Sequence, residues 1–134
     1  MNKLSIENNI ENLDKVAGFI EKFGDENGLS GKTVFELNLI LDELVTNIVS
    51  YAYKDEESHT IDITIRKRDN EIKIQVTDDG NEFNPLKKEE VNLDTPLEEK
   101  GIGGLGIHIV KQKTDEIFYE RKDNKNILNL TKKI

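Results

Sequence analysis

Two polar residues lie one helical turn apart in a segment that is rich in apolar residues. In DELVTN, Glu43 and Asn47 are four positions apart, so on a helix they share one face. An amide oxygen can hold a hydrated divalent cation, and a carboxylate can take a proton from an attacking hydroxyl or water. The pair therefore predicts a cation site beside a general base, although an exposed polar stripe or a hydrogen-bonded polar pair would carry the same residues.

A second polar cluster, VTDDGNEF at residues 76 to 83, ends an alternating apolar segment. The carboxylate of Asp78 could accept a hydrogen bond from an exocyclic amine, and Gly80 could let a flat ring approach the backbone. Asp78, Asp79 and Gly80 are also the residues of an ordinary turn. Calcium binding by the two aspartates is a weaker alternative, because the regular spacing of oxygen ligands in a calcium loop is missing.

The segment GIGGLGIHIV, at residues 101 to 110, holds four glycines within six positions: Gly101, Gly103, Gly104 and Gly106. Glycines before a helix leave backbone N–H groups free to bind an anion, and the helix dipole adds partial positive charge there. The segment predicts either a phosphate site or a sharp corner. It does not follow a strand in a βαβ unit, as a dinucleotide fingerprint does, and it lacks the G-K-[ST] of a P-loop. We expect His108 to pack or to face solvent.

Two helices are predicted to position the first cluster. Apolar residues between 13 and 23 recur at helical spacing, and Gly24 and Gly28 should weaken and end that helix. Ser30 is a suitable N-cap for a longer helix over residues 31 to 53. Because apolar residues occupy most of the circumference of the second helix, we expect it to lie in the core.

Strands are predicted to position the second cluster. Apolar and polar residues alternate on both sides of Asp69-Asn70, which indicates a hairpin with one buried face. Residues 84 to 100 hold both prolines and many charges, so we interpret them as a long surface loop. The other predicted elements are an edge strand at 3 to 7, a helix at 105 to 113, and strands at 114 to 121 and 126 to 133, joined by a turn at 122 to 125. The fold class is therefore α+β, a two-layer sandwich with helices on one face of a mostly antiparallel sheet, in a single domain over residues 1 to 134.

Composition excludes several classes of protein. The net charge of -8 over 134 residues argues against general nucleic-acid binding, which needs a basic face. No stretch approaches the roughly 20 apolar residues of a membrane span, and the N-terminus lacks the pattern of a signal peptide. The absence of cysteine excludes disulfides and cysteine-bound zinc. We therefore expect a cytoplasmic protein without a membrane or direct nucleic-acid partner.

Taken in order, the three clusters resemble the N, G1 and G2 boxes of the GHKL (Bergerat-fold) ATPases, the superfamily of gyrase and histidine kinases. The small size, the DDGNEFNP form of the second box and GGLGIHIVK look like the stand-alone anti-sigma serine/threonine kinases. Many histidine kinases have Asp-x-Gly-x-Gly in the second box, whereas Glu82 stands at the last of these positions here. The chain shows no dimerisation helix with a phospho-accepting histidine, so we do not expect an autonomous histidine kinase.

The resemblance implies ATP and Mg²⁺ as cofactors. It assigns Glu43 as the catalytic base, Asn47 to the magnesium ion and Asp78 to the amino group of adenine, with Gly80 making room for the base. Tyr51, one further turn along the helix, could line the pocket.

The resemblance also assigns a phosphate loop and a lid. The loop would comprise Gly101, Gly103, Gly104, Leu105 and Gly106, with Lys100 before it to neutralise phosphate charge, although a solvated lysine fits that position as well. The lid over the nucleotide would span about residues 84 to 103.

The function implied by the resemblance is a partner switch. The protein would phosphorylate an anti-anti-sigma (STAS-type) protein and sequester a sigma factor, and a homodimer is plausible by resemblance only. A regulator that binds nucleotide to gate a protein contact, without catalysing transfer, is the alternative.

Overall fold

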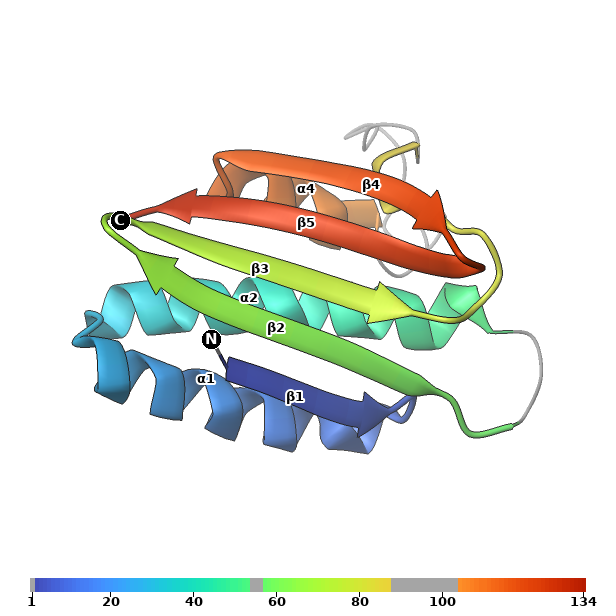
Figure 1. Ribbon diagram of the computed structural model, residues 1–134, viewed down its shortest axis with the longest axis horizontal. Coiled ribbons are helices and arrows are strands. Elements are labelled where there is room, and N and C mark those ends of the chain that lie inside the picture. Colours follow the sequence, from blue (N-terminus) through green and yellow to red (C-terminus); the bar gives the residue numbers. More distant parts are fainter. Residues whose placement is uncertain (1, 54–56, 88–103) are drawn as a thin grey trace.

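Five antiparallel strands form one sheet, and helices cover one of its faces (Figure 1). The computed structural model describes residues 2–53, 57–87 and 104–134. The strands lie in the order β1-β2-β3-β5-β4, and each neighbouring pair is antiparallel. Their bounds are β1 Asn2–Glu7, β2 Thr60–Arg68, β3 Glu71–Asp78, β4 Glu116–Lys122 and β5 Lys125–Lys133. This arrangement confirms the predicted α+β sandwich.

The helices α1, α2 and α4 lie on the same side of the sheet (Figure 1). They span Leu13–Asn27, Gly31–Asn47 and Gly104–Lys113, respectively. Three short turns accompany them: the 3₁₀ turns η1 Ile10–Asn12 and η3 Pro85–Lys87, and the π-helical turn η2 Ile48–Ala52. As predicted, the side chain of Ser30 caps α2 by accepting a hydrogen bond from the Thr33 N–H at 3.1 Å.

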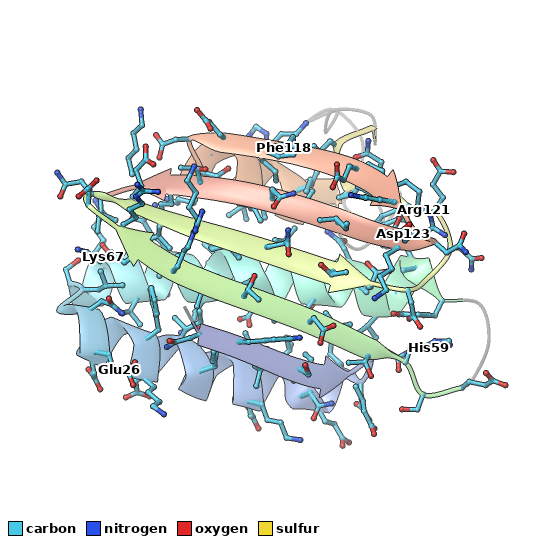
Figure 2. The ribbon with its side chains drawn as sticks, viewed as in Figure 1. Glu26, His59, Lys67, Phe118, Arg121 and Asp123 are labelled. Atoms are coloured by element: carbon cyan, nitrogen blue, oxygen red, sulfur yellow. The ribbon has the colours of Figure 1, made fainter. Side chains whose placement is uncertain are left out.

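The alternating apolar residues of the first hairpin face the helices and form the core. Ile61, Ile63 and Ile65 of β2 are fully buried, and so are Leu37 and Ile40 of α2. The opposite face of the sheet is mostly polar, although Phe118 of β4 is 57% exposed (Figure 2). The predicted burial of α2 is therefore confirmed, because this helix lies directly against the buried face of the strands.

Two tight turns and one crossover determine which strand ends meet. Asp69 (φ 54°) lies in the predicted β2–β3 turn, and Asp123 (φ 53°) and Asn124 (φ 61°) form the β4–β5 turn. Asp and Asn tolerate this left-handed conformation better than most residues. After α4 the chain forms β4 at the edge of the sheet and returns as β5, which pairs with β3. In this pairing Asp78 lies opposite Asn126.

Two predicted helix features differ in the structure. The α-helix that begins at residue 31 ends at Asn47, and the rest of the predicted span to residue 53 is mostly the π turn η2. Apolar spacing does not distinguish these hydrogen-bond patterns. Gly24 does not end α1; a Cβ there would lie 2.5 Å from Cγ2 of Val34, so the glycine allows α1 and α2 to approach closely. The helix ends instead at Gly28, whose φ is 63°.

Part of the predicted loop and lid lies outside the described residues. Of the segment from 84 to 103, the structure describes residues 84 to 87, which contain η3. Along the described residues, no helix is both long and apolar enough to cross a membrane.

Candidate functional site

Asn47, the last residue of α2, presents a buried oxygen without a partner. Asn47 is 2% exposed, and its Oδ1 has no hydrogen bond to any described residue. Leaving a buried acceptor unpaired costs about 1–3 kcal/mol, so a ligand at this oxygen would be stabilising. Asn38 of the same helix has a similarly unpaired Oδ1, which means that an unpaired oxygen alone does not define a site. What distinguishes Asn47 is the pocket beside it.

That pocket brings together Asn47 of the first polar cluster and Asp78 of the second, whereas Glu43 is not among its lining residues. It is small, with a volume of about 20 Å³. It lies between the end of α2, η2, the end of β3, the middle of β4, the start of β5 and the chain after β3. The lining residues are Leu44, Asn47, Ile48, Val76, Asp78, Phe83, Pro85, Tyr119, Asn126 and Leu128. Apolar walls with a few buried polar groups are typical of a small-molecule site.

Asp78, the last residue of β3, contributes a buried carboxylate to this pocket. It is 4% exposed, and its Oδ1 accepts hydrogen bonds from the Gly80 N–H and from Nδ2 of Asn126, both at 2.9 Å. Burial raises the pKa of Asp78, and these two hydrogen bonds act in the opposite direction. No described residue donates a hydrogen bond to Oδ2. Asp78 is therefore held on one side and can accept a hydrogen bond on the other.

Glu43 precedes Asn47 by one turn of α2 and is half-buried. Burial raises its pKa, and the negative charge of the neighbouring Asp42 raises it further. A carboxylate with a raised pKa holds a transferred proton more firmly, which suits a general base.

Gly80 has a packing role that the sequence did not reveal. A Cβ at this position would lie 2.6 Å from the carbonyl oxygen of Ala52 and 2.8 Å from its Cβ. The same carbonyl accepts the N–H of Asn81 at 2.7 Å. The absence of a side chain at Gly80 therefore lets the chain after β3 pack against the end of η2. Atoms of Ala52 occupy the space that a Cβ at position 80 would need. A contact between Gly80 and an adenine ring stays a prediction.

Asp79 and Tyr51 lie outside the pocket lining. Asp79 Oδ1 accepts a hydrogen bond from the Tyr53 hydroxyl at 3.0 Å and lies 3.4 Å from Nδ1 of His59, so it links the two ends of the η2–β2 connection. Among the described residues, no three His, Cys, Asp or Glu side chains form a metal-binding group. The Tyr51 ring stacks on Phe83 with centroids 5.7 Å apart. Tyr51 thus supports a pocket wall through Phe83.

The glycine-rich cluster is only partly described. Gly104, Leu105 and Gly106 form the first residues of α4, as a helix-start phosphate site would require. Lys100, Gly101 and Gly103 lie outside the described residues. Their roles in phosphate binding stay predictions. His108 is exposed, as expected, and its Nε2 lies 3.1 Å from Nε2 of Gln112.

Sequence reasoning missed Asn126, the most connected polar residue of the pocket. It is 4% exposed, and besides Asp78 its Nδ2 donates to the Asn81 carbonyl at 2.8 Å. Its Oδ1 accepts hydrogen bonds from the Phe83 N–H at 3.1 Å, from the Tyr119 hydroxyl and from the Arg121 guanidinium. The signal was weak, because Asn126 follows a turn and only the β3–β5 register places it opposite Asp78.

Comparison with known proteins identifies relatives that are named as ATPase domains and protein kinases. The family model of the histidine kinase-like ATPase domain matches residues 6–132. The serine/threonine-protein kinase BtrW of Bordetella bronchiseptica is 29% identical over 76% of this chain and 72% of its own length. The serine-protein kinase RsbW of Oceanobacillus iheyensis is 30% identical over 67% of this chain, and the match spans 60% of the relative.

Solved structures share the fold at low sequence identity. The histidine kinase domain of the blue-light activated kinase EL346 from Erythrobacter litoralis has a TM-score of 0.55 and 19% identity, over 92% of this chain and 60% of that one. The catalytic domain of histidine kinase ThkA has a TM-score of 0.52 and 14% identity, over 99% of this chain and 96% of that one. The resemblance inferred from the three motifs is confirmed: the chain belongs to the histidine kinase-like ATPase domain family, in the branch whose curated relatives are serine-protein kinases.

Proposed function

We propose that this protein is an ATP-dependent serine/threonine protein kinase. One observation carries the proposal: Asn47 and Asp78, two buried polar residues that each keep an oxygen without a described partner, line the same apolar pocket. Membership in an ATPase domain family supports ATP as the ligand, and relatives named as serine-protein kinases support phosphoryl transfer to a protein hydroxyl.

Each residue has a defined part in binding. Oδ2 of Asp78 would accept a hydrogen bond from the amino group of adenine, which guanine does not offer at that position. The donor set fits Mg²⁺, because the unpaired Oδ1 of Asn47 is a neutral amide oxygen of the kind this ion accepts. When bound, Mg²⁺ would neutralise charge on the phosphates.

Glu43 would act on the hydroxyl of the protein substrate. The hydroxyl oxygen forms a bond to the γ-phosphorus, the bond from that phosphorus to the leaving ADP oxygen breaks, and the hydroxyl proton passes to Glu43. The raised pKa of Glu43 favours acceptance of this proton.

The partners we propose are those of a regulatory switch. The substrate would be a small anti-anti-sigma protein of the STAS type, and a sigma factor would be the protein that the kinase sequesters, with a homodimer as the acting form. Phosphorylation adds negative charge and new acceptor oxygens to the substrate, which changes its affinity for the kinase.

Radiolabelled transfer tests the proposal. The protein is mixed with Mg²⁺, γ-labelled ATP and purified STAS proteins from the same genome, and we expect label on a serine or threonine of one of them. Glu43→Gln should bind ATP and lose transfer, whereas Asn47→Ala should lose binding. Asn38→Ala is the matched control, because it removes a similar unpaired amide from α2 outside the pocket lining.

The other outcomes are informative. If the protein binds ATP, but the ATP is recovered unchanged and no STAS protein is labelled, the kinase proposal is wrong. The protein would then be a regulator that binds nucleotide to gate a protein contact. If wild-type protein binds no ATP, both functions are wrong.

A further inference from the structure

The amide of Asn126 has only one orientation that satisfies its surroundings. Its Oδ1 accepts hydrogen bonds from the Phe83 N–H and from the Arg121 guanidinium, both at 3.1 Å. Both of these groups can only donate. Its Nδ2 faces the Asn81 carbonyl at 2.8 Å and Asp78 Oδ1 at 2.9 Å, which accept. A flipped amide would place donors against donors and acceptors against acceptors. Both N–H bonds of Asn126 are therefore committed.

This amide joins three parts of the pocket that are distant in sequence. Asp78 ends β3, and Asn126 is the second residue of β5. Arg121, near the end of β4 (Figure 2), donates to the Gly80 carbonyl at 2.8 Å as well as to Asn126. The resulting ring of hydrogen bonds holds residues 80 to 83, which lead to the pocket wall at Phe83. These hydrogen bonds therefore fix the position of the Asp78 carboxylate relative to the pocket wall at Phe83.

We propose that Asn126 is a positioning residue for nucleotide binding: it engages Oδ1 of Asp78, so that Oδ2 is left as the acceptor that faces a base. The inference rests on the proposed function for the identity of the ligand. Asn126 acts through Asp78, since two donors on the same oxygen orient the carboxylate and leave its other oxygen available.

Removal of the Asn126 side-chain amide should favour the protonated form of Asp78. The charged and titratable groups around this carboxylate come from every neighbouring element: Asp79 directly after β3, Asp62 on β2, Arg121 and Tyr119 on β4, Tyr53 after η2, and Lys125 at the start of β5. Burial already raises the pKa of Asp78, and the hydrogen bond from Asn126 is the largest influence that lowers it. In Asn126→Ala the pKa of Asp78 should therefore rise.

The decisive measurement needs no nucleotide. The carboxyl carbon of Asp78 is followed by ¹³C NMR from pH 3 to 9 in wild-type protein, in Asn126→Ala and in Asn129→Ala. The last is the matched control, because Asn129 lies on the same strand and bonds Gln75 on the polar face of the sheet. We expect Asp78 to titrate at higher pH only in Asn126→Ala. An unchanged midpoint in that variant would overturn the proposal.

ATP affinity over the same pH range adds the functional readout. We expect Asn126→Ala to bind ATP at least about tenfold more weakly at neutral pH, as for loss of a hydrogen bond to a charged group, and the loss should grow as the pH falls. Equal ATP affinity in Asn126→Ala and Asn129→Ala would overturn the role in binding. Wild-type protein that binds no ATP refutes the proposed function, while the ¹³C result still decides whether Asn126 governs Asp78.

If Asn126→Ala does not fold, the wild-type protein itself provides the test. The side-chain amide protons of Asn126 should shift with the same midpoint as the Asp78 carboxyl carbon, because one hydrogen bond joins them. Amide protons that do not respond to the Asp78 titration would contradict the proposal.

Discussion

Two carboxylates of the site have raised pKa values, but their surroundings suit different tasks. Asp78 is almost fully buried and receives two hydrogen bonds that offset part of the effect of burial on its pKa and hold the carboxylate in one orientation. Glu43 is half-buried beside Asp42, and both burial and the like charge favour its protonated form. The first arrangement suits a fixed acceptor, and the second suits a group that must take up a proton.

At the residue scale, the Asp42–Glu43 pair predicts a pH dependence. Glu43 must be unprotonated to act as a base, so the transfer rate should fall as the pH falls through its raised pKa. Asp42→Asn removes the like charge, lowers the pKa of Glu43 and should move this decline to lower pH. Single-turnover rates at saturating ATP measure the profile. If the decline is unchanged in Asp42→Asn, Glu43 is not the group that titrates.

At the element scale, the close contact between Gly80 and Ala52 fixes the end of β3 against η2. The missing side chain and the two hydrogen bonds of Asn81 to the Ala52 carbonyl, at 2.7 Å and 3.2 Å, make this junction tight. Since η2 directly follows Asn47, the junction determines how far the candidate cation ligand lies from the segment after Asp78.

Gly80→Ala should therefore destabilise the fold. The new methyl group would meet backbone atoms that cannot move alone, and we expect a loss of about 1–3 kcal/mol, as in overpacked cores. Gly18→Ala is the matched control: its Cβ would meet nothing within 4 Å in the middle of α1, so it should stabilise by about 0.5–1 kcal/mol. Urea unfolding gives both free energies. Equal effects of the two substitutions would contradict the steric argument.

A buried ion pair joins elements at the other end of the sheet. Nζ of Lys132 in β5 lies 2.6 Å from Oε2 of Glu36 in α2 and donates to the Lys113 carbonyl, at the end of α4, at 2.9 Å. The side chains of Lys132 and Glu36 are 10% and 13% exposed, respectively. The hydrogen bond from Lys132 lowers the pKa of Glu36. The pair therefore stabilises the packing of both helices on the sheet.

Lys132→Ala should destabilise the protein by about 1–3 kcal/mol at neutral pH, because it leaves a mostly buried carboxylate with only the long ion pair to Lys32, at 4.0 Å. Lys133→Ala, at an exposed neighbouring position, should change stability by less than about 0.5 kcal/mol. Glu36 has a lowered pKa when folded, so its contribution is present above its ordinary value of 4.5 and is lost as the pH falls through the lower folded value. Urea midpoints for the two variants should therefore converge in acid; a constant difference would contradict the ion-pair explanation.

At the scale of the whole molecule, local patterns predicted the fold better than they predicted the site. Alternation around Asp69-Asn70 was sufficient for the first hairpin, since period-two burial is a local signal. The role of Asn126 could not be predicted, because it depends on β5 pairing with β3 across an intervening helix and strand. The steric role of Gly80 likewise required the position of Ala52.

Ligand binding should stabilise the whole domain. At an ATP concentration 100 times the dissociation constant, binding to the folded state adds about 2.7 kcal/mol. We therefore expect Mg²⁺ with ATP to raise the melting temperature of wild-type protein and of Asn38→Ala, and to leave that of Asn47→Ala unchanged. Differential scanning fluorimetry with GTP as a further control measures these shifts. A similar rise of the melting temperature in Asn47→Ala would show that Asn47 does not take part in ATP binding.

The hydrogen bond between Asp78 and Asn126 spans 48 positions of the chain. Contacts between residues so far apart form slowly, because closing the long loop between them costs conformational entropy. The first hairpin and the pairing of α1 with α2 can form from local contacts, whereas the pocket is complete only after β5 has docked beside β3. In refolding kinetics, the ability to bind nucleotide should therefore be acquired with the last step, after most of the helical signal has already returned.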